Sequence, residues 1–242
     1  MKLEGKVVIV TGAGRGLGRE LSVGFAEAGA DLVLAARTLE QLEVTADRVR
    51  KAGKKALIVP TNVSDEEQVN SMVEKAIEEY GRIDVMLNNA GITSPDSFLD
   101  ISRKRWDLII GVNLEGTFLC TKASLPKMLE QGSGMIINVS SILAKEIRFS
   151  VAYGVTKAGL ERFTLGLARE MRKNAGIAIT CIRPYFVTTE AVTGFLEGKD
   201  TSSWETPDMW AKYVPMVAAA DPQSVTGKIL DKAALEEMFG PV

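Results

Sequence analysis

The sequence predicts a doubly wound parallel α/β sheet, folded as a single domain over all 242 residues. Short β-branched runs alternate with longer amphipathic stretches, as expected when strands alternate with helices. The runs are almost continuously hydrophobic, which is typical of strands covered by helices on both faces. The stretches between them are long enough for right-handed crossovers, and no linker or repeat marks a domain boundary. The expected strands are Lys6–Val10, Leu32–Ala36, Ala56–Val59, Val85–Leu87, Met135–Val139 and Ile177–Ile182.

The composition is that of a soluble globular protein, with 46% hydrophobic and 25% charged residues. The net charge is -2 and the basic residues are scattered, so the sequence predicts no basic patch that would bind nucleic acid. The sequence contains no histidine, which excludes imidazole as a catalytic base and most zinc sites. We therefore expect no metal centre, and acid-base chemistry must fall to Tyr, Lys, Asp or Glu.

Two cysteines, Cys120 and Cys181, lie inside apolar segments. We expect two buried free thiols, with a disulfide as the alternative, and free thiols indicate a cytoplasmic protein. The apolar run Val7–Val10 is too short for the core of a signal peptide. No apolar stretch approaches membrane-spanning length, so we expect no membrane partner.

A glycine-rich turn follows the first strand and precedes a helical pattern over Arg19–Ala28. Glycines let the backbone approach a pyrophosphate closely, and the start of the helix offers free N–H groups and a partial positive charge. The turn therefore predicts a dinucleotide site, with a purely structural turn as the alternative. The residues expected to bind the dinucleotide here are Gly12, Gly14, Arg15, Gly16, Leu17 and Gly18.

The second strand ends at Ala36, where an NAD-specific site places an acidic residue that binds the ribose hydroxyls. No acid is present there. Arg37 and Arg15 can instead bind a 2′-phosphate, so we expect NADP(H) as the cofactor. The alternatives are a solvated arginine at the start of a helix for Arg37 and an exposed turn residue for Arg15.

Four more fragments follow the later strands: Asn88–Gly91, Asn113 in a helical stretch, Asn138–Ser141 and Tyr153–Lys157. Ligands of open α/β sheets bind outside the carboxyl ends of the strands, so these fragments are expected to meet in one crevice. On a helix, Tyr153 and Lys157 share a face, where the ammonium can lower the pKa of the phenol. The structural alternatives are a helix-bending core amide for Asn113, a strand-end cap for Asn88 and Asn89, and ordinary turn residues for the two serines.

Together these motifs resemble the short-chain dehydrogenase/reductase family. The resemblance implies a Rossmann fold and hydride transfer between a nicotinamide dinucleotide and a carbonyl or alcohol carbon. It implies that Tyr153 is the general acid/base and that Lys157 lowers its pKa while holding the nicotinamide ribose. It further implies that Ser141 polarises the substrate oxygen and that Asn113 positions a water in a proton relay.

The resemblance also places the rest of the cofactor. The adenine is expected near Asn62 and Val63, the adenosine side beside Asn89, Ala90 and Gly91, and the nicotinamide near Pro184, Val187 and Thr189. The sequence departs from the family at two of these places. Asn62 replaces the usual Asp and keeps an oxygen that can accept a hydrogen bond. Tyr185 replaces the usual Gly, and its large side chain should narrow or reshape the substrate pocket.

Which serine polarises the substrate oxygen depends on how the sequence is aligned with the family. Counting back from Tyr153 by the family's commonest interval gives Ser140, whereas counting forward from Asn138 in the strand gives Ser141. The strand count is preferred, because loops absorb a deletion whereas a one-residue slip in a strand turns every side chain to the opposite face.

A segment of about residues 188–221 breaks the regular pattern with glycines, prolines and aromatic residues, and we expect it to cover the substrate. Its aromatic residues, with those just before it, line either an apolar pocket or the core of this segment: Phe149, Tyr185, Phe186, Phe195, Trp204 and Trp210. The expected substrate is a ketone, an aldehyde, a 3-oxoacyl group or the corresponding alcohol.

Two other functions are compatible with the fold: a non-catalytic dinucleotide sensor, and an epimerase that uses transient oxidation. The four intact site residues disfavour the sensor, and the short chain disfavours the epimerase. By resemblance, a homo-oligomer is expected, a tetramer or a dimer, through the helices that follow the fourth and fifth strands.

Overall fold

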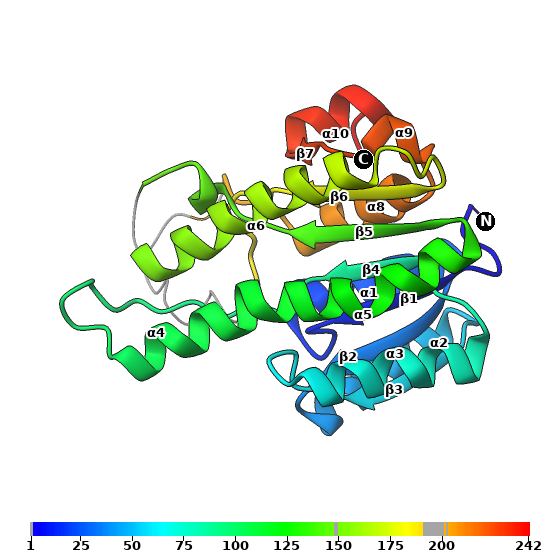
Figure 1. Cartoon of the computed structure of the whole chain (residues 1–242), viewed down its shortest axis with the longest axis horizontal. Helices are drawn as coiled ribbons and strands as arrows, with labels where there is room; N and C mark the ends of the chain where they lie inside the picture. The colour runs from blue at the N-terminus through cyan, green and yellow to red at the C-terminus, as the bar shows by residue number, and fades with distance from the viewer. Residues whose placement is uncertain (1, 148–149, 191–200, 202) are drawn as a thin grey trace.

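A computed structural model describes residues 2–147, 150–190, 201 and 203–242 of the chain. Within them, one seven-stranded parallel sheet has the strand order β3-β2-β1-β4-β5-β6-β7. Figure 1 shows this sheet at the centre of the molecule. The strands are β1 (Val7–Thr11), β2 (Asp31–Ala36), β3 (Ala56–Pro60), β4 (Val85–Asn88), β5 (Gly134–Val139), β6 (Ile177–Ile182) and β7 (Ile229–Leu230). The predicted doubly wound parallel sheet in a single domain is confirmed.

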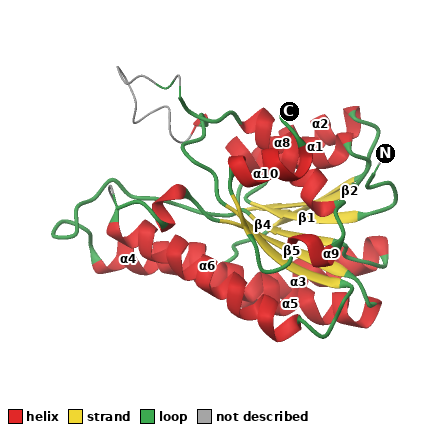
Figure 2. Cartoon of the chain, turned by 90° about the horizontal axis from the view of Figure 1, so that it is seen from above, coloured by secondary structure: helices red, strands yellow, loops and turns green. Residues whose placement is uncertain are grey.

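Helices cover both faces of the sheet (Figure 2). One face carries α1 (Gly16–Glu27), α2 (Leu39–Lys51), α8 (Pro207–Ala218) and α10 (Lys232–Phe239). The other carries α3 (Glu66–Tyr80), α4 (Arg103–Ile110), α5 (Gly116–Gln131) and α6 (Val151–Met171). Short turns of helix complete the described chain: η1 (Gly111–Glu115), η2 (Ile142–Ala144) and α9 (Pro222–Val225).

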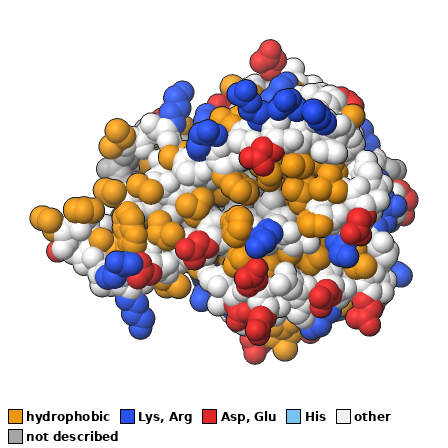
Figure 3. All heavy atoms as spheres, viewed as in Figure 1, with side chains coloured by type: hydrophobic (Ala, Val, Ile, Leu, Met, Phe, Trp, Pro, Cys, Tyr) orange, Lys and Arg blue, Asp and Glu red, His pale blue; other side chains and the backbone are white. Residues whose placement is uncertain are grey.

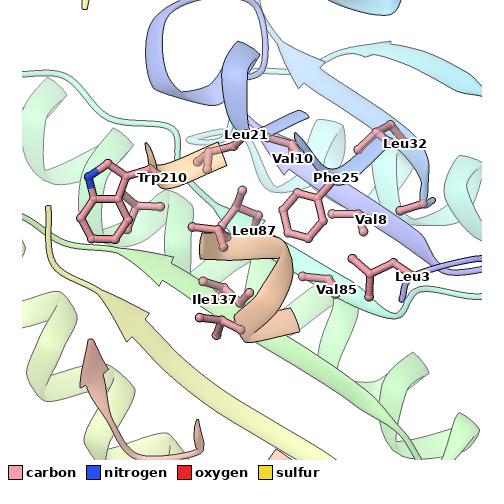
Figure 4. Packing of buried hydrophobic residues seen from close by; sticks show 14 of the residues in the cluster. Leu3, Val8, Val10, Leu21, Phe25, Leu32, Val85, Leu87, Ile137 and Trp210 are labelled. Atoms are coloured by element: carbon pink, nitrogen blue, oxygen red, sulfur yellow. The ribbon is translucent and has the colours of Figure 1, made fainter. Parts of the chain in front are cut away.

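Alternation along the strands sends side chains to two separate cores. In β1, Val8 and Val10 belong to the cluster beneath α1, whereas Val7 and Ile9 belong to the cluster beneath α3 and α5. Figure 4 shows the first cluster, in which Phe25 of α1 lies against the strands. Because both faces of the central strands are buried, their continuous hydrophobic runs are explained.

The six expected strands agree with the structure to within one residue at each end. The seventh strand, Ile229–Leu230, was not among them, because two residues are too few to produce a recognisable pattern. Helix α1 begins at Gly16, inside the glycine-rich turn, rather than at Arg19. The start of the helix is therefore part of the turn itself.

Helix α8 packs along α1 at a very close distance. A Cβ placed on Gly24 would lie 2.1 Å from the carbonyl oxygen of Ala211, which no real Cβ tolerates. Trp210 and Tyr213 of α8 are fully buried, so Trp210 belongs to the core and not to a pocket wall. Phe149 and Phe195 lie outside the described residues.

Both cysteines are buried and free, as expected. Within the described part of the chain, one continuous helical run, Arg103–Gln131, is long and apolar enough to cross a membrane by length and composition alone. The sequence does not mark this run as an apolar stretch, because charged residues such as Asp107, Glu115 and Lys122 interrupt it. Of its most apolar window, 56% is buried inside the protein, as in the core helix of a soluble fold.

Candidate active site

The glycine-rich turn brings the end of β1 and the start of α1 into close contact. Gly12 and Gly16 have φ of 66° and 54°, a left-handed conformation that favours glycine. A Cβ on Gly18 would lie 2.2 Å from the carbonyl oxygen of Gly12. Arg15, at the N-cap of α1, gives its helix no side-chain capping hydrogen bond. The glycines of the turn thus leave its backbone open in front of uncapped N–H groups, which fits the pyrophosphate of a dinucleotide.

The end of β4 is fastened to this turn through Thr11. Its hydroxyl oxygen accepts the N–H groups of Asn89 at 3.0 Å and Ala90 at 3.1 Å. The amide of Asn89 donates to the carbonyl of Thr11 at 2.9 Å. One residue further, a Cβ on Gly91 would lie 3.6 Å from both Asn113 Oδ1 and Lys157 Nζ. Residues 89–91 therefore connect the cradle with the other predicted site residues.

The two arginines expected to select the cofactor are exposed. Arg15 begins α1, and Arg37 lies just after β2. Among the described residues, neither makes an ion pair, so both guanidinium groups remain available to a ligand. At the neighbouring strand end, Asn62 Oδ1 accepts the N–H of Ser64 at 3.3 Å, while Val63 is buried. All four residues lie at the same carboxyl edge of the sheet as the cradle.

Helix α6 presents Tyr153 and Lys157 one turn apart on one face. Lys157 Nζ lies 5.4 Å from the centre of the Tyr153 ring and donates to the carbonyl of Val139 at 2.6 Å. Tyr153 is hydrogen-bonded to the side chain of Ser141. A phenol, a hydroxyl and an ammonium thus meet at the end of β5.

Burial controls the protonation of this group. Burial raises the pKa of Tyr153 to about 12, and the hydrogen bond from Ser141 opposes this rise with a smaller effect. Burial also lowers the pKa of Lys157 to about 8. Desolvation of the phenol is the largest cause of the Tyr153 shift, and the lowering of the phenol pKa by Lys157 stays a prediction. At neutral pH the phenol is therefore a proton donor.

Adjacent serines at the end of β5 have different partners. Ser141 contacts Tyr153 and accepts the N–H of Leu143 at 3.3 Å. Ser140 Oγ instead donates to Glu161 Oε1 at 2.8 Å. The structure thus brings Ser141, and not Ser140, to Tyr153, as the strand-based alignment predicts.

Asn113 lies in η1, a short π-helix between α4 and α5, and is 1% exposed. Its amide nitrogen donates to the carbonyl of Ile92 at 2.9 Å and to Thr156 Oγ1 at 3.1 Å. Its oxygen accepts the N–H of Ile92 at 2.8 Å. The side chain therefore fastens the chain after β4 to α6, beside Lys157.

The chain after β6 returns to the cradle. The carbonyl of Pro184 accepts the N–H of Ile142 at 2.8 Å, and Val187 forms a parallel bridge with Glu205. A Cβ on Gly16 would lie 3.4 Å from the Cβ of Thr189. The predicted nicotinamide residues therefore lie between the Ser141 loop and the glycine turn.

Glu205 is a further residue near the site that no sequence motif predicts. Its Oε2 accepts the N–H of Tyr185 at 2.8 Å and the indole N–H of Trp210 at 2.9 Å. Burial raises its pKa, and these two hydrogen bonds lower it. The carboxylate thus fixes the chain after β6 against α8. No motif marks Glu205, because its partners are scattered along the chain.

Aromatic rings follow β6 at the place where Tyr185 replaces the family's glycine. Tyr185 meets Phe186 edge to face, with ring centres 4.8 Å apart. Phe186 stacks on Trp204 with ring centres 4.9 Å apart. These rings lie beside the Val187–Glu205 bridge, so they form an apolar surface next to the predicted nicotinamide residues.

This chain is similar in sequence and in fold to known proteins. A profile of the family described as short chain dehydrogenase matches residues 6–200. An uncharacterized oxidoreductase of Staphylococcus aureus (strain USA300) is 36% identical over 208 residues, covering 86% of this chain and 88% of that protein. Dehydrogenase/reductase SDR family member 1 of Mus musculus is 33% identical over 261 aligned positions, covering 98% and 83%. The crystal structure of a short-chain type dehydrogenase/reductase from Mycobacterium marinum superposes with a TM-score of 0.88 at 29% identity, covering 95% and 94%.

Proposed function

Because the chain belongs to the short-chain dehydrogenase/reductase family, we propose that it is an NADP(H)-dependent oxidoreductase acting on a carbonyl or alcohol carbon. The observation that carries the proposal is the contact of Ser141 with Tyr153 beside Lys157, at the sheet edge that holds the glycine cradle. A proton donor and a phosphate cradle on one edge suit hydride transfer coupled to proton transfer.

When bound at the glycine cradle, NADPH would supply the hydride for reduction. Ser141 holds the substrate carbonyl oxygen, and Tyr153 donates its proton to that oxygen as negative charge develops there. Lys157 places a positive charge near the resulting phenolate. Carbonyl, hydride and proton together give the alcohol, and the reverse steps oxidise it. Asn113 holds the chain beside Lys157, where a water in the proton relay would bind.

NADP(H) is proposed over NAD(H) because of Arg15 and Arg37. Both are exposed at the cradle, and neither is ion-paired among the described residues. The strand end at Ala36 carries no acidic residue that would bind the ribose hydroxyls and repel a 2′-phosphate.

The proposed substrate is a ketone, an aldehyde or a 3-oxoacyl compound with an apolar body. The rings of Tyr185, Phe186 and Trp204 support it, because they offer apolar surface beside the nicotinamide segment. The described parts of residues 188–221 include α8 and Glu205, which forms a bridge with Val187 just before the segment, and we propose that this segment covers the substrate.

A panel of carbonyl and alcohol compounds, monitored by the absorbance of NADPH or NADH, tests the function. Turnover of at least one compound, lost on Tyr153→Phe, is expected. Tight dinucleotide binding without turnover of any compound would favour the sensor. Inversion of an alcohol centre without net change of the cofactor would favour the epimerase.

A homo-oligomer is proposed, a tetramer or a dimer, formed through the helices that follow β4 and β5. Figure 3 shows hydrophobic side chains gathered over this face. Those most exposed on α4, α5 and α6 are Leu108, Phe118, Val151, Val155 and Leu165. Burying them in a subunit contact would remove apolar surface from water. A cytoplasmic setting is proposed from the two buried free thiols, with neither nucleic acid nor membrane as partner.

A further inference from the structure

The carboxylate of Glu161 is bound on three sides. Glu161 lies on α6, one turn beyond Lys157. Its Oε1 accepts hydrogen bonds from Ser140 Oγ at 2.8 Å and Arg183 Nε at 2.8 Å, and its Oε2 accepts from Arg183 Nη2 at 2.7 Å. The side chains of Glu161 and Arg183 are only 14% and 16% exposed. A two-pronged pair with so little exposure has one strongly preferred geometry.

Both partners of Glu161 adjoin residues that the proposed reaction uses. Ser140 directly precedes Ser141 at the end of β5, and Arg183 directly precedes Pro184 at the end of β6. One carboxylate on α6 therefore connects to the ends of two neighbouring strands. A change in its position would move the substrate-binding hydroxyl and the nicotinamide segment together.

Glu161 also balances charge in the buried region behind the site. The thiol of Cys181 reports on this charge: burial raises its pKa to about 12, Glu161 raises it too, and Lys157 and Arg183 lower it. The carboxylate and the two cations therefore interact with one point in the core. Asp231 Oδ2 also lies 3.9 Å from Arg183 Nη1, but the Asp231 side chain is 47% exposed, so without Glu161 the two cations would lose their buried partner.

We propose that Glu161 is a positioning residue, which fixes the ends of β5 and β6 relative to Tyr153 and Lys157 through Ser140 and Arg183. It does not touch the substrate. The proposal rests on the proposed function, since the atoms that Glu161 aligns are those of the proposed reaction. It adds to the Ser141–Tyr153–Lys157 group a carboxylate that sets the geometry of that group.

The test compares Glu161→Gln with Glu170→Gln at saturating substrate and cofactor. Gln keeps the volume of Glu161 but removes the charge that holds Arg183. Glu170 is exposed on the same helix and makes no ion pair among the described residues. We expect kcat to fall roughly 10- to 100-fold in Glu161→Gln and to stay within roughly twofold in the control. A purely structural carboxylate would lower the melting temperature and leave kcat unchanged well below it, and that result would overturn the proposal.

A second variant addresses the unpaired charge. Glu161→Gln/Arg183→Gln removes both members of the ion pair, so that Arg183 is not left buried without its carboxylate, while Lys157 keeps its charge as in the single variant. We expect its kcat to be about as low as that of the single variant, because the strand ends are released in both. Recovery of the parental kcat would overturn the positioning role and would leave charge balance as the only role of Glu161.

Binding measurements separate this proposal from the proposed function. If the unmodified protein turns over no compound of the panel, the proposed function fails, but dinucleotide binding can still be measured by fluorescence. Glu161→Gln should then weaken the binding of NADPH or NADH by roughly 10-fold relative to Glu170→Gln, because the nicotinamide segment starts beside Arg183. Equal dissociation constants in the two variants would overturn the positioning role.

Discussion

Ser140 and Ser141 are adjacent in the chain, yet their hydroxyls have different partners: Ser140 donates to Glu161, and Ser141 contacts Tyr153. This divergence predicts different losses of activity. Ser141→Ala should lower turnover by about 10² to 10³-fold, because a preorganised donor to the developing oxyanion is removed. Ser140→Ala should lose much less, since it removes only one of the hydrogen bonds to Glu161. Steady-state kinetics of both variants decide, and an inactive Ser140→Ala beside an active Ser141→Ala would contradict the assignment.

Tyr153→Phe removes one oxygen and little volume. Turnover should fall by about 10² to 10⁴-fold while NADPH still binds, because the proton donor is lost and the cradle is intact. Tyr213→Phe is a matched control, since Tyr213 is fully buried and donates to the carbonyl of Gly240 at 2.9 Å. If Tyr153→Phe keeps more than roughly a tenth of the activity, another group donates the proton.

Arg37→Asp should reverse or erase the preference for NADPH. One charge-assisted contact with the 2′-phosphate contributes about 1.5 to 3 kcal/mol, so NADPH should bind the unmodified protein roughly 10- to 150-fold more tightly than NADH. Titration of both cofactors by fluorescence measures this ratio. Equal dissociation constants for NADPH and NADH in the unmodified protein would show that neither Arg15 nor Arg37 binds the 2′-phosphate.

Gly24→Ala should destabilise the fold by about 1 to 3 kcal/mol, because the new methyl group would collide with the backbone of Ala211. Gly159→Ala on α6 is the control. There a Cβ would lie 3.6 Å from the side chain of Leu114, an ordinary contact, and alanine favours a helix by about 1 kcal/mol. Denaturant unfolding should separate the two variants. Equal midpoints would mean that α1 and α8 can move apart without cost.

Phe118→Arg on α5 should weaken the oligomer, because it places a charge in the proposed subunit contact beside Lys122, whose ammonium lies 5.5 Å from the centre of the Phe118 ring. Val44→Arg on α2 is the control, since Val44 is also about half exposed but lies on the opposite face of the sheet. Light scattering after size-exclusion chromatography gives the mass of each. An unmodified protein that runs as a monomer would remove the basis of this prediction.

Sequence patterns predicted those features that depend on neighbouring residues. The strands follow from hydrophobic runs, and the turn from Gly12 to Gly18 follows from its glycines, of which Gly12 and Gly18 lie against neighbouring backbone. The contact of Ser141 with Tyr153 followed from strand alternation. The pairings of Glu161 and Glu205 had no such signal, because their partners lie far away in the chain or carry no motif. The direction of the Tyr153 pKa shift also depends on burial that no spacing reveals.

The close packing of α8 on α1 has a consequence for biosynthesis. Helix α1 is made early, but the helix that covers it begins only at Pro207, near the end of the chain. Until the ribosome has released that part, Leu21 and Phe25 of α1 lack the Trp210 side of their cluster (Figure 4). The nascent chain therefore presents apolar surface throughout most of translation, and chains shortened before α8 should aggregate or bind chaperones.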